Sequence, residues 1–390
     1  VVGNSKNAAG GLEMTIWRYN DDGSLDTTFG SGATAGLGYV LFNAGGTGAA
    51  GAANATKIDN GIRMLLDSVG RYVIVGNSVS AAGAAAYTPV LWRYNSNGSI
   101  DTTFGDGATA GLGYVLFQNA GPGVAGAANG VKQDVTWGFA IDSSGRYVTG
   151  GSSKNAAGGI EVSILRYNAD GSLDTTFGAG ATAGLGYVLF NAGGTGTAGA
   201  ANASKSDVIY NLNIDSNGRY VCSGRSKNAA GGFEVALWRY NADGSIDNTF
   251  GNGATAGQGY VLYNAGGTSV AGRANATKAE FPYSLRIDSL GRYVIGGMSR
   301  NVGGGYEAMV MRYGTDGSLD TTFGGGTGYS LLNHDVAGIA GAANATKTDY
   351  VISMQVDRLN RVVASGTSKN AAGGSELLVM RWKSDGTLDF

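Results

Sequence analysis

A stretch of nine residues at positions 22–30 returns along the chain with few changes. It reads DGSLDTTFG, and further copies begin at Asn97, Asp170, Asp243 and Asp316, with a shortened copy at Asp385. We call this stretch and its copies the signature loops. Their second aspartates, the signature aspartates, recur every 69 to 75 residues: Asp26, Asp101, Asp174, Asp247, Asp320 and Asp389. A repeat that fills a chain of 390 residues restricts it to folds in which neighbouring repeats bury one another's apolar surface.

Every full repeat contains four short apolar runs, which we name a to d. In the first full repeat they are residues 62–67, 71–76, 88–94 and 114–117. Their length, their β-branched and aromatic residues, and the glycines and asparagines between them predict strands. An Asp-Ser-x-Gly sequence between runs a and b favours a tight turn, so these two runs are expected to form a hairpin. We find no pattern typical of an amphipathic helix.

Run c decides between the all-β architectures. In one copy, Val235 and Leu237 face one side of the strand, while Ala236 and Trp238 face the other. Because both faces are apolar, the sheet must be covered on both sides, and without helices the sheets must stack on one another. The predicted fold is an all-β, single-domain β-propeller over residues 1–390, with about six four-stranded antiparallel blades of which the first and last are incomplete. A two-sheet sandwich fits less well, and an open solenoid remains an alternative.

The repeats also resemble a known family. Residues 168–178, NADGSLDTTFG, preceded by Leu165-Arg166-Tyr167, resemble the delta-60 type repeat of large secreted bacterial proteins. More distantly, residues 141–148 are similar to the hairpin of runs a and b in NHL-like propeller blades. The resemblance implies a β-propeller on a secreted or cell-surface bacterial protein, and it brings no catalytic motif with it. The chain begins inside a repeat without an initiator methionine, so we expect a processed product or a fragment.

Composition argues against several classes of function. Charged residues make up 14% of the chain and the net charge is -2, so no basic surface for nucleic acid is expected. No run approaches the roughly 18 apolar residues of a membrane-spanning helix, and we expect no membrane insertion. The single cysteine, Cys222, excludes a disulfide framework, and its apolar neighbours predict a small buried residue. His334 is the only histidine and no phosphate-binding glycine motif is present, so we expect no enzyme and no cofactor.

The b-to-c and d-to-a loops are expected on one face of the propeller, opposite the signature loops, and they supply the candidate ligand-binding residues. In each d-to-a loop an asparagine precedes a lysine by three residues. The candidates are Asn54, Lys57, Lys132, Asn202, Lys205, Asn275, Lys278, Asn344 and Lys347. Such a set would hold an acidic or carbohydrate ligand. The competing interpretation, which we favour, is that each asparagine caps its loop and each lysine pairs with the acidic residue two positions later, because identical residues in every repeat are typical of a structural role.

The signature loops offer a second candidate site. Asn241, Asp243 and Asp247 present oxygen atoms of the kind that Ca2+ binds, although no bidentate glutamate follows as it does in an EF-hand. We favour an Asx-turn, in which the signature aspartate accepts hydrogen bonds from backbone amides or from the arginine of run c, such as Arg18. Phe29 and its copies would then fill the space between neighbouring blades. Calcium is therefore an alternative and not the expected cofactor.

Three functions are compatible with the sequence. The leading hypothesis is a non-catalytic propeller for adhesion or protein–protein interaction, which binds a protein or glycan partner through the face that carries the b-to-c and d-to-a loops. The second is a lectin-like carbohydrate binder, for which Trp92, Trp137 and Trp238 supply aromatic rings. The third is a polysaccharide-active enzyme with an axial site, which would need a carboxylate cluster in a deep pocket.

Overall fold

The computed structural model describes most of the chain. The described residues are 1–6, 10–42, 58–79, 87–117, 134–154, 159–190, 206–228, 231–263, 279–301, 304–332, 348–369 and 374–389. They fall into two compact units, Val1–Leu189 and Phe190–Phe390. The single domain over residues 1–390 stays a prediction.

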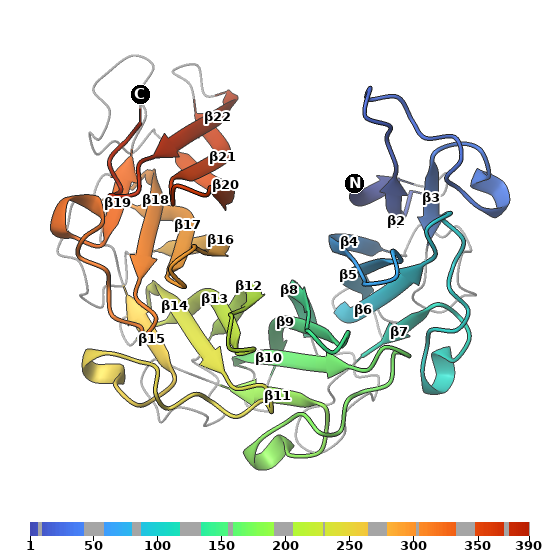
Figure 1. Ribbon diagram of the computed structural model, residues 1–390, viewed down its shortest axis with the longest axis horizontal. Coiled ribbons are helices and arrows are strands. Elements are labelled where there is room, and N and C mark those ends of the chain that lie inside the picture. Colours follow the sequence, from blue (N-terminus) through green and yellow to red (C-terminus); the bar gives the residue numbers. More distant parts are fainter. Residues whose placement is uncertain are drawn as a thin grey trace. The chain divides into compact units, whose positions relative to one another are not determined.

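The first unit is built from antiparallel sheets whose strands pair in sequence order (Figure 1). The first sheet contains β1 (Val2–Lys6), β2 (Leu12–Trp17) and β3 (Tyr39–Phe42). The second contains β4 (Asp59–Leu66), β5 (Tyr72–Val79), β6 (Tyr87–Tyr94) and β7 (Tyr114–Leu116). The third contains β8 (Asp134–Ile141), β9 (Tyr147–Lys154), β10 (Ile160–Tyr167) and β11 (Tyr187–Phe190).

The second unit repeats this arrangement. Its first sheet contains β12 (Asp207–Ile214), β13 (Tyr220–Lys227), β14 (Phe233–Tyr240) and β15 (Tyr260–Tyr263). The next contains β16 (Glu280–Ile287), β17 (Tyr293–Arg300), β18 (Tyr306–Tyr313) and β19 (Tyr329–Leu332). The last contains β20 (Asp349–Val356), β21 (Val362–Lys369) and β22 (Ser375–Trp382). The six sheets of the described residues confirm the predicted blades, including the incomplete first and last ones.

Short 3-10 turns supply all the helical structure of the described residues. Each comes just before the last strand of a four-stranded sheet or before β3: η1 (Gly32–Thr34), η2 (Gly107–Thr109), η3 (Gly180–Thr182), η4 (Gly253–Thr255) and η5 (Gly324–Gly326). Within the ranges given above, no helix has the length and apolar character needed to cross a membrane.

The strand at one edge of each complete sheet begins earlier than the sequence predicts. β4 begins at Asp59, three residues before the predicted start, and the other edge strands β8, β12, β16 and β20 are extended in the same way. The reason is that the first residue of each is a buried acid that pairs across to a serine, as Asp59 does to Ser78. A polar residue at this position resembles a loop residue in the sequence.

Each of these edge strands also contains a β-bulge. The register shifts around one unpaired residue, which is large and apolar or aromatic in every repeat: Ile62, Trp137, Tyr210, Tyr283 and Ile352. Bulges redirect a side chain away from the regular alternation of a strand. Trp137 is 38% exposed and Ile352 is 50% exposed, so the bulges place large side chains at the surface.

The core lies between successive sheets. In β14, Val235, Ala236, Leu237 and Trp238 are all fully buried, which confirms that run c is covered on both faces. One cluster of buried residues joins β14 to the following sheet through Leu285 and its neighbours. Burying an aliphatic side chain of this size stabilises the fold by about 1.5–3 kcal/mol, so face-to-face stacking supplies much of the stability.

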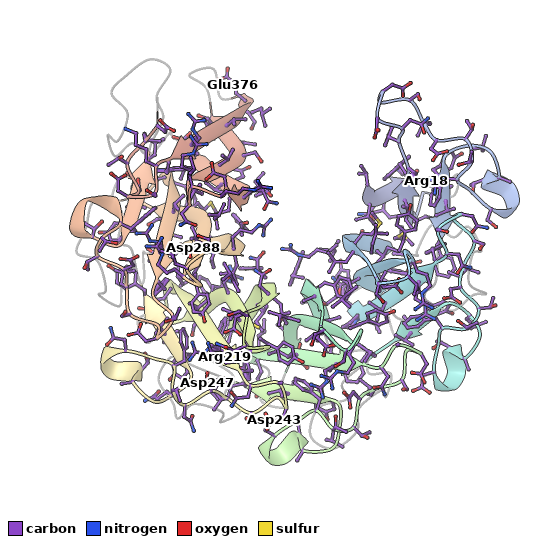
Figure 2. All side chains as sticks on the ribbon, in the orientation of Figure 1. Arg18, Arg219, Asp243, Asp247, Asp288 and Glu376 are labelled. Atoms are coloured by element: carbon purple, nitrogen blue, oxygen red, sulfur yellow. The ribbon has the colours of Figure 1, made fainter. Side chains whose placement is uncertain are left out.

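An ion pair joins the signature loop to run c in each sheet, and in the sheet of β12 to β15 this pair is buried. The carboxylate of Asp247 accepts hydrogen bonds from the backbone N–H and the hydroxyl of Thr249, at 3.0 and 2.6 Å, and from Nε of Arg239 at 2.7 Å. Nη1 of Arg219, just before β13, lies 3.3 Å from the same carboxylate (Figure 2). Burial opposes ionisation, but the bonds from Thr249 and Arg239 hold the pKa of Asp247 below its ordinary value.

The same pairing of a signature aspartate with the arginine of run c recurs in every repeat. The pairs are Arg18–Asp26, Arg93–Asp101, Arg166–Asp174, Arg239–Asp247, Arg312–Asp320 and Arg381–Asp389, with nitrogen–oxygen distances of 2.6 to 2.8 Å. The predicted Asx-turn and its arginine partner are therefore confirmed.

Within each of the two units, a signature loop also contacts the next one along the chain. Within the second unit, the N–H of Gly251 donates to the carbonyl of Asp316 at 3.0 Å, and Arg239 donates to the carbonyl of Thr315. Phe250 is fully buried, and its ring lies 6.0 Å from that of Tyr293 in the following sheet. These contacts confirm that the signature phenylalanine fills the space between neighbouring blades.

Candidate functional site

The two ends of each sheet carry different connections. At one end lie the turn between the first two strands and the signature loop, which the ion pair between Arg71 and Asp101 joins at 3.3 Å. At the opposite end, Val79 of β5 pairs with Tyr87 of β6, where the b-to-c connection leaves the sheet. We call this the loop end. The prediction that the signature loops lie opposite the b-to-c loops is confirmed.

The candidate residues of the d-to-a loops cannot be placed. Asn54, Lys57, Lys132, Asn202, Lys205, Asn275, Lys278, Asn344 and Lys347 all lie outside the described residues, as does His334. Their roles stay predictions.

A cluster of partly exposed aromatic side chains occupies the loop end of the second unit. We call it the aromatic patch: Tyr210, Phe233, Phe281, Tyr283, Tyr306 and Tyr350. Phe281 is central, since its ring centroid lies 6.3 Å from that of Phe233 and 6.2 Å from those of Tyr283 and Tyr306. The rings of Phe281 and Tyr283 are nearly parallel, with an angle of 12° between them. The patch thus joins three successive sheets.

Three of these rings form a row along the edge strands. Tyr210 lies in β12, Tyr283 in β16 and Tyr350 in β20, with centroids 6.1 Å apart for the first pair and 6.4 Å for the second. Tyr210 and Tyr283 are the bulge residues of their strands. Burial raises the pKa of Tyr283 to about 12, and the neighbouring phenol of Tyr210 adds to the rise. The phenols of Tyr210 and Tyr283 therefore stay neutral near pH 7.

Arg225 of β13 lies within this patch. Its guanidinium carbon is 4.2 Å from the ring centroid of Phe233, 5.0 Å from that of Phe281 and 5.8 Å from that of Tyr210. These distances are typical of cation–π contacts. The Nε atom is buried and has no hydrogen-bond partner among the described residues.

Arg225 also departs from the repeat pattern. The other repeats carry uncharged residues at its position, two before the last residue of the second blade strand: Asn4, Asn77, Ser152, Met298 and Thr367. The residue type varies at this position, but the charge is confined to one repeat, as expected of a binding residue, whereas structural roles recur in all repeats. The sequence contained this signal, but it becomes informative only once the register of the strands is known.

The tryptophans proposed for a carbohydrate ligand are mostly not accessible. Trp92 and Trp238 are fully buried in β6 and β14, so the prediction that they present rings to a ligand is wrong. The reason is that run c is covered on both faces. Trp137, at the bulge of β8, is 38% exposed.

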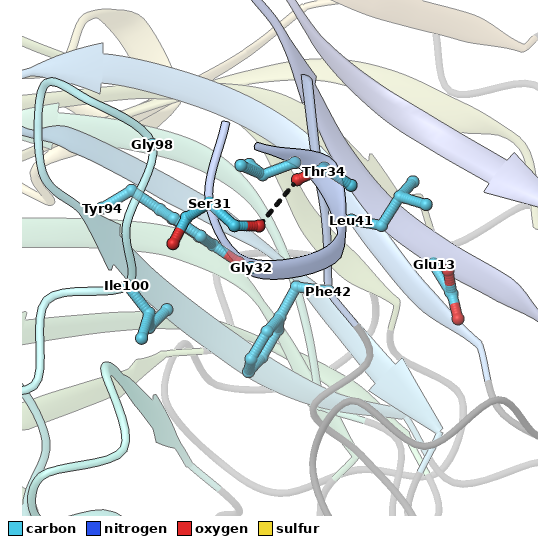
Figure 3. Close-up of a pocket in the computed structure, with 10 residues that line it drawn as sticks. Glu13, Ser31, Gly32, Thr34, Leu41, Phe42, Tyr94, Gly98 and Ile100 are labelled. Carbon is cyan, nitrogen blue, oxygen red and sulfur yellow. Dashed lines mark hydrogen bonds between the residues drawn. The ribbon is translucent and has the colours of Figure 1, made fainter. Parts of the chain in front are cut away.

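Two pockets in the described residues are built from side chains that recur in the repeats. The first, of about 380 Å³, lies in the first unit and is lined by Glu13, Ser31, Phe42, Tyr94 and others (Figure 3). The hydroxyl of Tyr94 is buried there without a partner. The equivalent hydroxyls of Tyr240 and Tyr313 are in the same state, so this feature belongs to the fold.

The second pocket, of about 430 Å³, lies in the second unit at the end of the sheets that carries the signature loops. Asp215, Arg219, Ser289, Tyr293 and Thr315 contribute to its lining. Arg219 and Asp215 form an ion pair at 2.8 Å within it. These charges are already paired, so the pocket offers no free charge to a ligand.

The signature loops do not fit the calcium alternative well. One carboxylate oxygen of Asp243 accepts from the backbone N–H and hydroxyl of Ser245, at 2.8 and 2.6 Å. Both oxygens of Asp247 are bonded to Thr249 or Arg239. Among the residues whose positions are known, no three His, Cys, Asp or Glu side chains gather in a way that would hold a metal ion.

Stacked four-stranded antiparallel sheets that bury both faces define a β-propeller. Sequence comparison agrees, because five segments match the family model described as a β-propeller domain of unknown function, DUF5122. The matched residues are 1–29, 70–104, 143–177, 216–250 and 291–323. The chain is thus a β-propeller, and each of the five matched segments falls in a different one of its repeats. The delta-60 name for the repeats stays a prediction. No curated protein matches the sequence.

Three solved structures that resemble the chain do so at low sequence identity. A protein of unknown function from Dyadobacter fermentans is 11% identical, with 84% of this chain and 80% of that chain covered and a TM-score of 0.42. A Trypanosoma rangeli sialidase is 10% identical, with 98% and 52% covered and a TM-score of 0.41. A fucose lectin from Kordia zhangzhouensis is 14% identical, with 47% and 92% covered and a TM-score of 0.25. Scores this low carry no argument about activity.

Proposed function

We propose that this chain is a non-catalytic recognition or adhesion propeller of a secreted or cell-surface protein, which binds its partner through the loop end. The aromatic patch of the second unit is the observation that carries the proposal. Soluble domains rarely leave several large aromatic rings partly exposed side by side unless the surface binds something. Tyrosine and arginine are also the side chains that most often dominate the energy of a binding interface.

The distribution of charge supports a non-catalytic role. The signature aspartates and the arginines of run c pair with one another in every repeat, so these groups serve the fold. Asp67, Asp142, Asp215, Asp288 and Asp357 likewise pair with the arginine four residues later. A catalytic acid or base would need a carboxylate that such bonds do not engage.

A lectin-like function is the second candidate, and the row of tyrosine rings favours it. Tyr210, Tyr283 and Tyr350 offer successive aromatic faces along the edge strands. Aromatic faces carry partial negative charge and attract the polarised C–H groups of a sugar ring. A row of rings suits an extended ligand better than a single sugar.

The test is a binding screen of the immobilised protein against a panel of polysaccharides and extracellular proteins. The first variant combines Tyr283→Ala and Tyr350→Ala in the aromatic patch. The matched control combines Leu290→Ala and Leu359→Ala, which are 65% and 67% exposed in the turns at the other end of the same two sheets.

We expect the tyrosine variant to lose at least about tenfold in affinity for whatever the wild-type protein binds, and the leucine variant to bind normally. If both variants bound the partner equally well, the interface would lie outside the aromatic patch. Release of a product from any bound polysaccharide would overturn the non-catalytic assignment.

A further inference from the structure

Arg225 is a cation without a counter-ion in the described residues. Arg219, six positions earlier, pairs with Asp215 at 2.8 Å and with Asp247 at 3.3 Å. None of the ion pairs between described residues involves Arg225. A buried or partly buried charge is normally balanced by an opposite charge, because the alternative costs desolvation energy. Within the described ranges, Arg225 therefore lacks the kind of partner that Arg219 and Arg239 have.

The surroundings of Arg225 strengthen its attraction for an anion. Phe233, Phe281 and Tyr210 surround the guanidinium and exclude water from much of it. Electrostatic interactions are stronger where water is excluded, and a guanidinium presents its N–H groups in a planar fork that matches a carboxylate. The rings also hold the fork in one orientation, so less side-chain entropy is lost when an anion binds.

The row of tyrosines begins beside this cation. Tyr210 contacts Arg225 and also lies 6.1 Å from Tyr283, which in turn lies 6.4 Å from Tyr350. A ligand anchored by its charge at Arg225 would thus continue over successive ring faces. The phenols of Tyr210 and Tyr283 are neutral, so these two rings do not repel an anion.

We propose that the aromatic patch and Arg225 together bind an acidic oligosaccharide, with a uronate carboxylate on the guanidinium and adjacent sugar rings against Tyr210 and Tyr283. This inference rests on the proposed binding function and names the ligand class of the same surface. An acidic peptide would supply the carboxylate as well, but it lacks the C–H ring faces that the row of tyrosines accommodates.

Calorimetric titration with three probes tests the inference: an oligogalacturonate, a neutral oligosaccharide of similar length, and poly-glutamate. The variants are Arg225→Met, which keeps the length and apolar bulk of the side chain but removes the charge, and Arg225→Lys, which keeps the charge but removes the planar fork. A thermal unfolding measurement on each variant establishes that it is folded.

We expect the wild-type protein to bind oligogalacturonate at least tenfold more tightly than the neutral sugar and poly-glutamate. Arg225→Met should lower the affinity for oligogalacturonate by about 10- to 100-fold, and Arg225→Lys by less. Added salt should weaken wild-type binding, which tests the charge even if Arg225→Met fails to fold.

Three outcomes would overturn the inference. If poly-glutamate binds as tightly as oligogalacturonate, the ligand class is an acidic peptide and not a sugar. If Arg225→Met binds oligogalacturonate as tightly as the wild-type protein does, or if the wild-type protein binds the neutral sugar equally well, no ion pair with Arg225 contributes to binding. No binding of oligogalacturonate, combined with a partner from the screen above that the tyrosine variant loses, rejects the ligand class and leaves the proposed function standing.

Discussion

Removing the acid of a buried signature-loop ion pair should lower the free energy of unfolding strongly. In the second sheet, Arg93 is 2% exposed and its Nε lies 2.7 Å from the carboxylate of Asp101, which is 6% exposed. In Asp101→Asn, the amide can still accept the bonds from Thr103, but its NH2 group would face the Arg93 donor. The guanidinium would be left buried without a counter-charge at this position. Loss of one partner from a buried pair costs about 3–5 kcal/mol.

The chain contains its own control for this change. Arg381 and Asp389 form the same pair at 2.6 Å, but their side chains are 44% and 17% exposed. Exposed pairs contribute about 1 kcal/mol or less because water screens them. Asp389→Asn should therefore cost much less than Asp101→Asn, although the two substitutions are chemically identical and occupy equivalent repeat positions.

Thermal unfolding followed by calorimetry measures the difference. For a unit of this size, 3–5 kcal/mol corresponds to a fall in melting temperature of roughly 6–20 °C, whereas Asp389→Asn should lower it by less than about 4 °C. Hydrogen exchange along β6 would show that the loss is local to the altered sheet. If the melting temperature fell equally in the two variants, the burial of the ion pair would not determine how much the pair contributes to stability.

Three further predictions concern a carboxylate, two turn glycines and the single cysteine. The hydrogen bonds from Thr103 and the ion pair with Arg93 hold the folded-state pKa of Asp101 below its ordinary value. The ionised carboxylate therefore stabilises the fold above the unfolded pKa of about 4, and this stabilisation is lost as the pH falls through the lower folded pKa. The melting temperature should stay level from pH 7 downward and then drop, and a level profile down to pH 2 would contradict the argument. Gly171→Ala should destabilise the first unit more than Gly145→Ala in urea unfolding, because both have positive φ but a Cβ at Gly171 would lie 2.9 Å from the ring of Phe104, while nothing lies near Gly145. Cys222 is buried and burial raises the pKa of its thiol, so a thiol reagent should label it only after unfolding; rapid labelling of the native protein would contradict its burial.

Much of the fold could be predicted because the information is local and repeated. The pairing of Arg18 with Asp26 joins residues eight positions apart, and it recurs with the same spacing in each repeat. By contrast, the second partner of Asp247 is Arg219, which lies 28 positions away. No pattern within a single strand indicates that contact, since it depends on how the turn and the signature loop meet at one end of the sheet.

The candidate site was harder to predict for the same physical reason. The aromatic patch gathers side chains from β12, β14, β16, β18 and β20, so it exists only after three sheets have stacked. The sequence instead drew attention to Trp92 and Trp238, whose rings are the most conspicuous. Those rings serve the core because strands covered on both faces have no exposed side.

The contact between successive signature loops affects how repeats can be gained or lost during evolution. Each joint uses a donor from one loop, such as Gly30, and a carbonyl from the next, such as Asn97, so the repeats join head to tail. Because the same nine residues supply both halves of the joint, a duplicated repeat inserted between two others would find a matching surface on either side. Copy number is therefore free to vary in whole repeats, whereas a partial deletion would leave a buried arginine without its carbonyl acceptor.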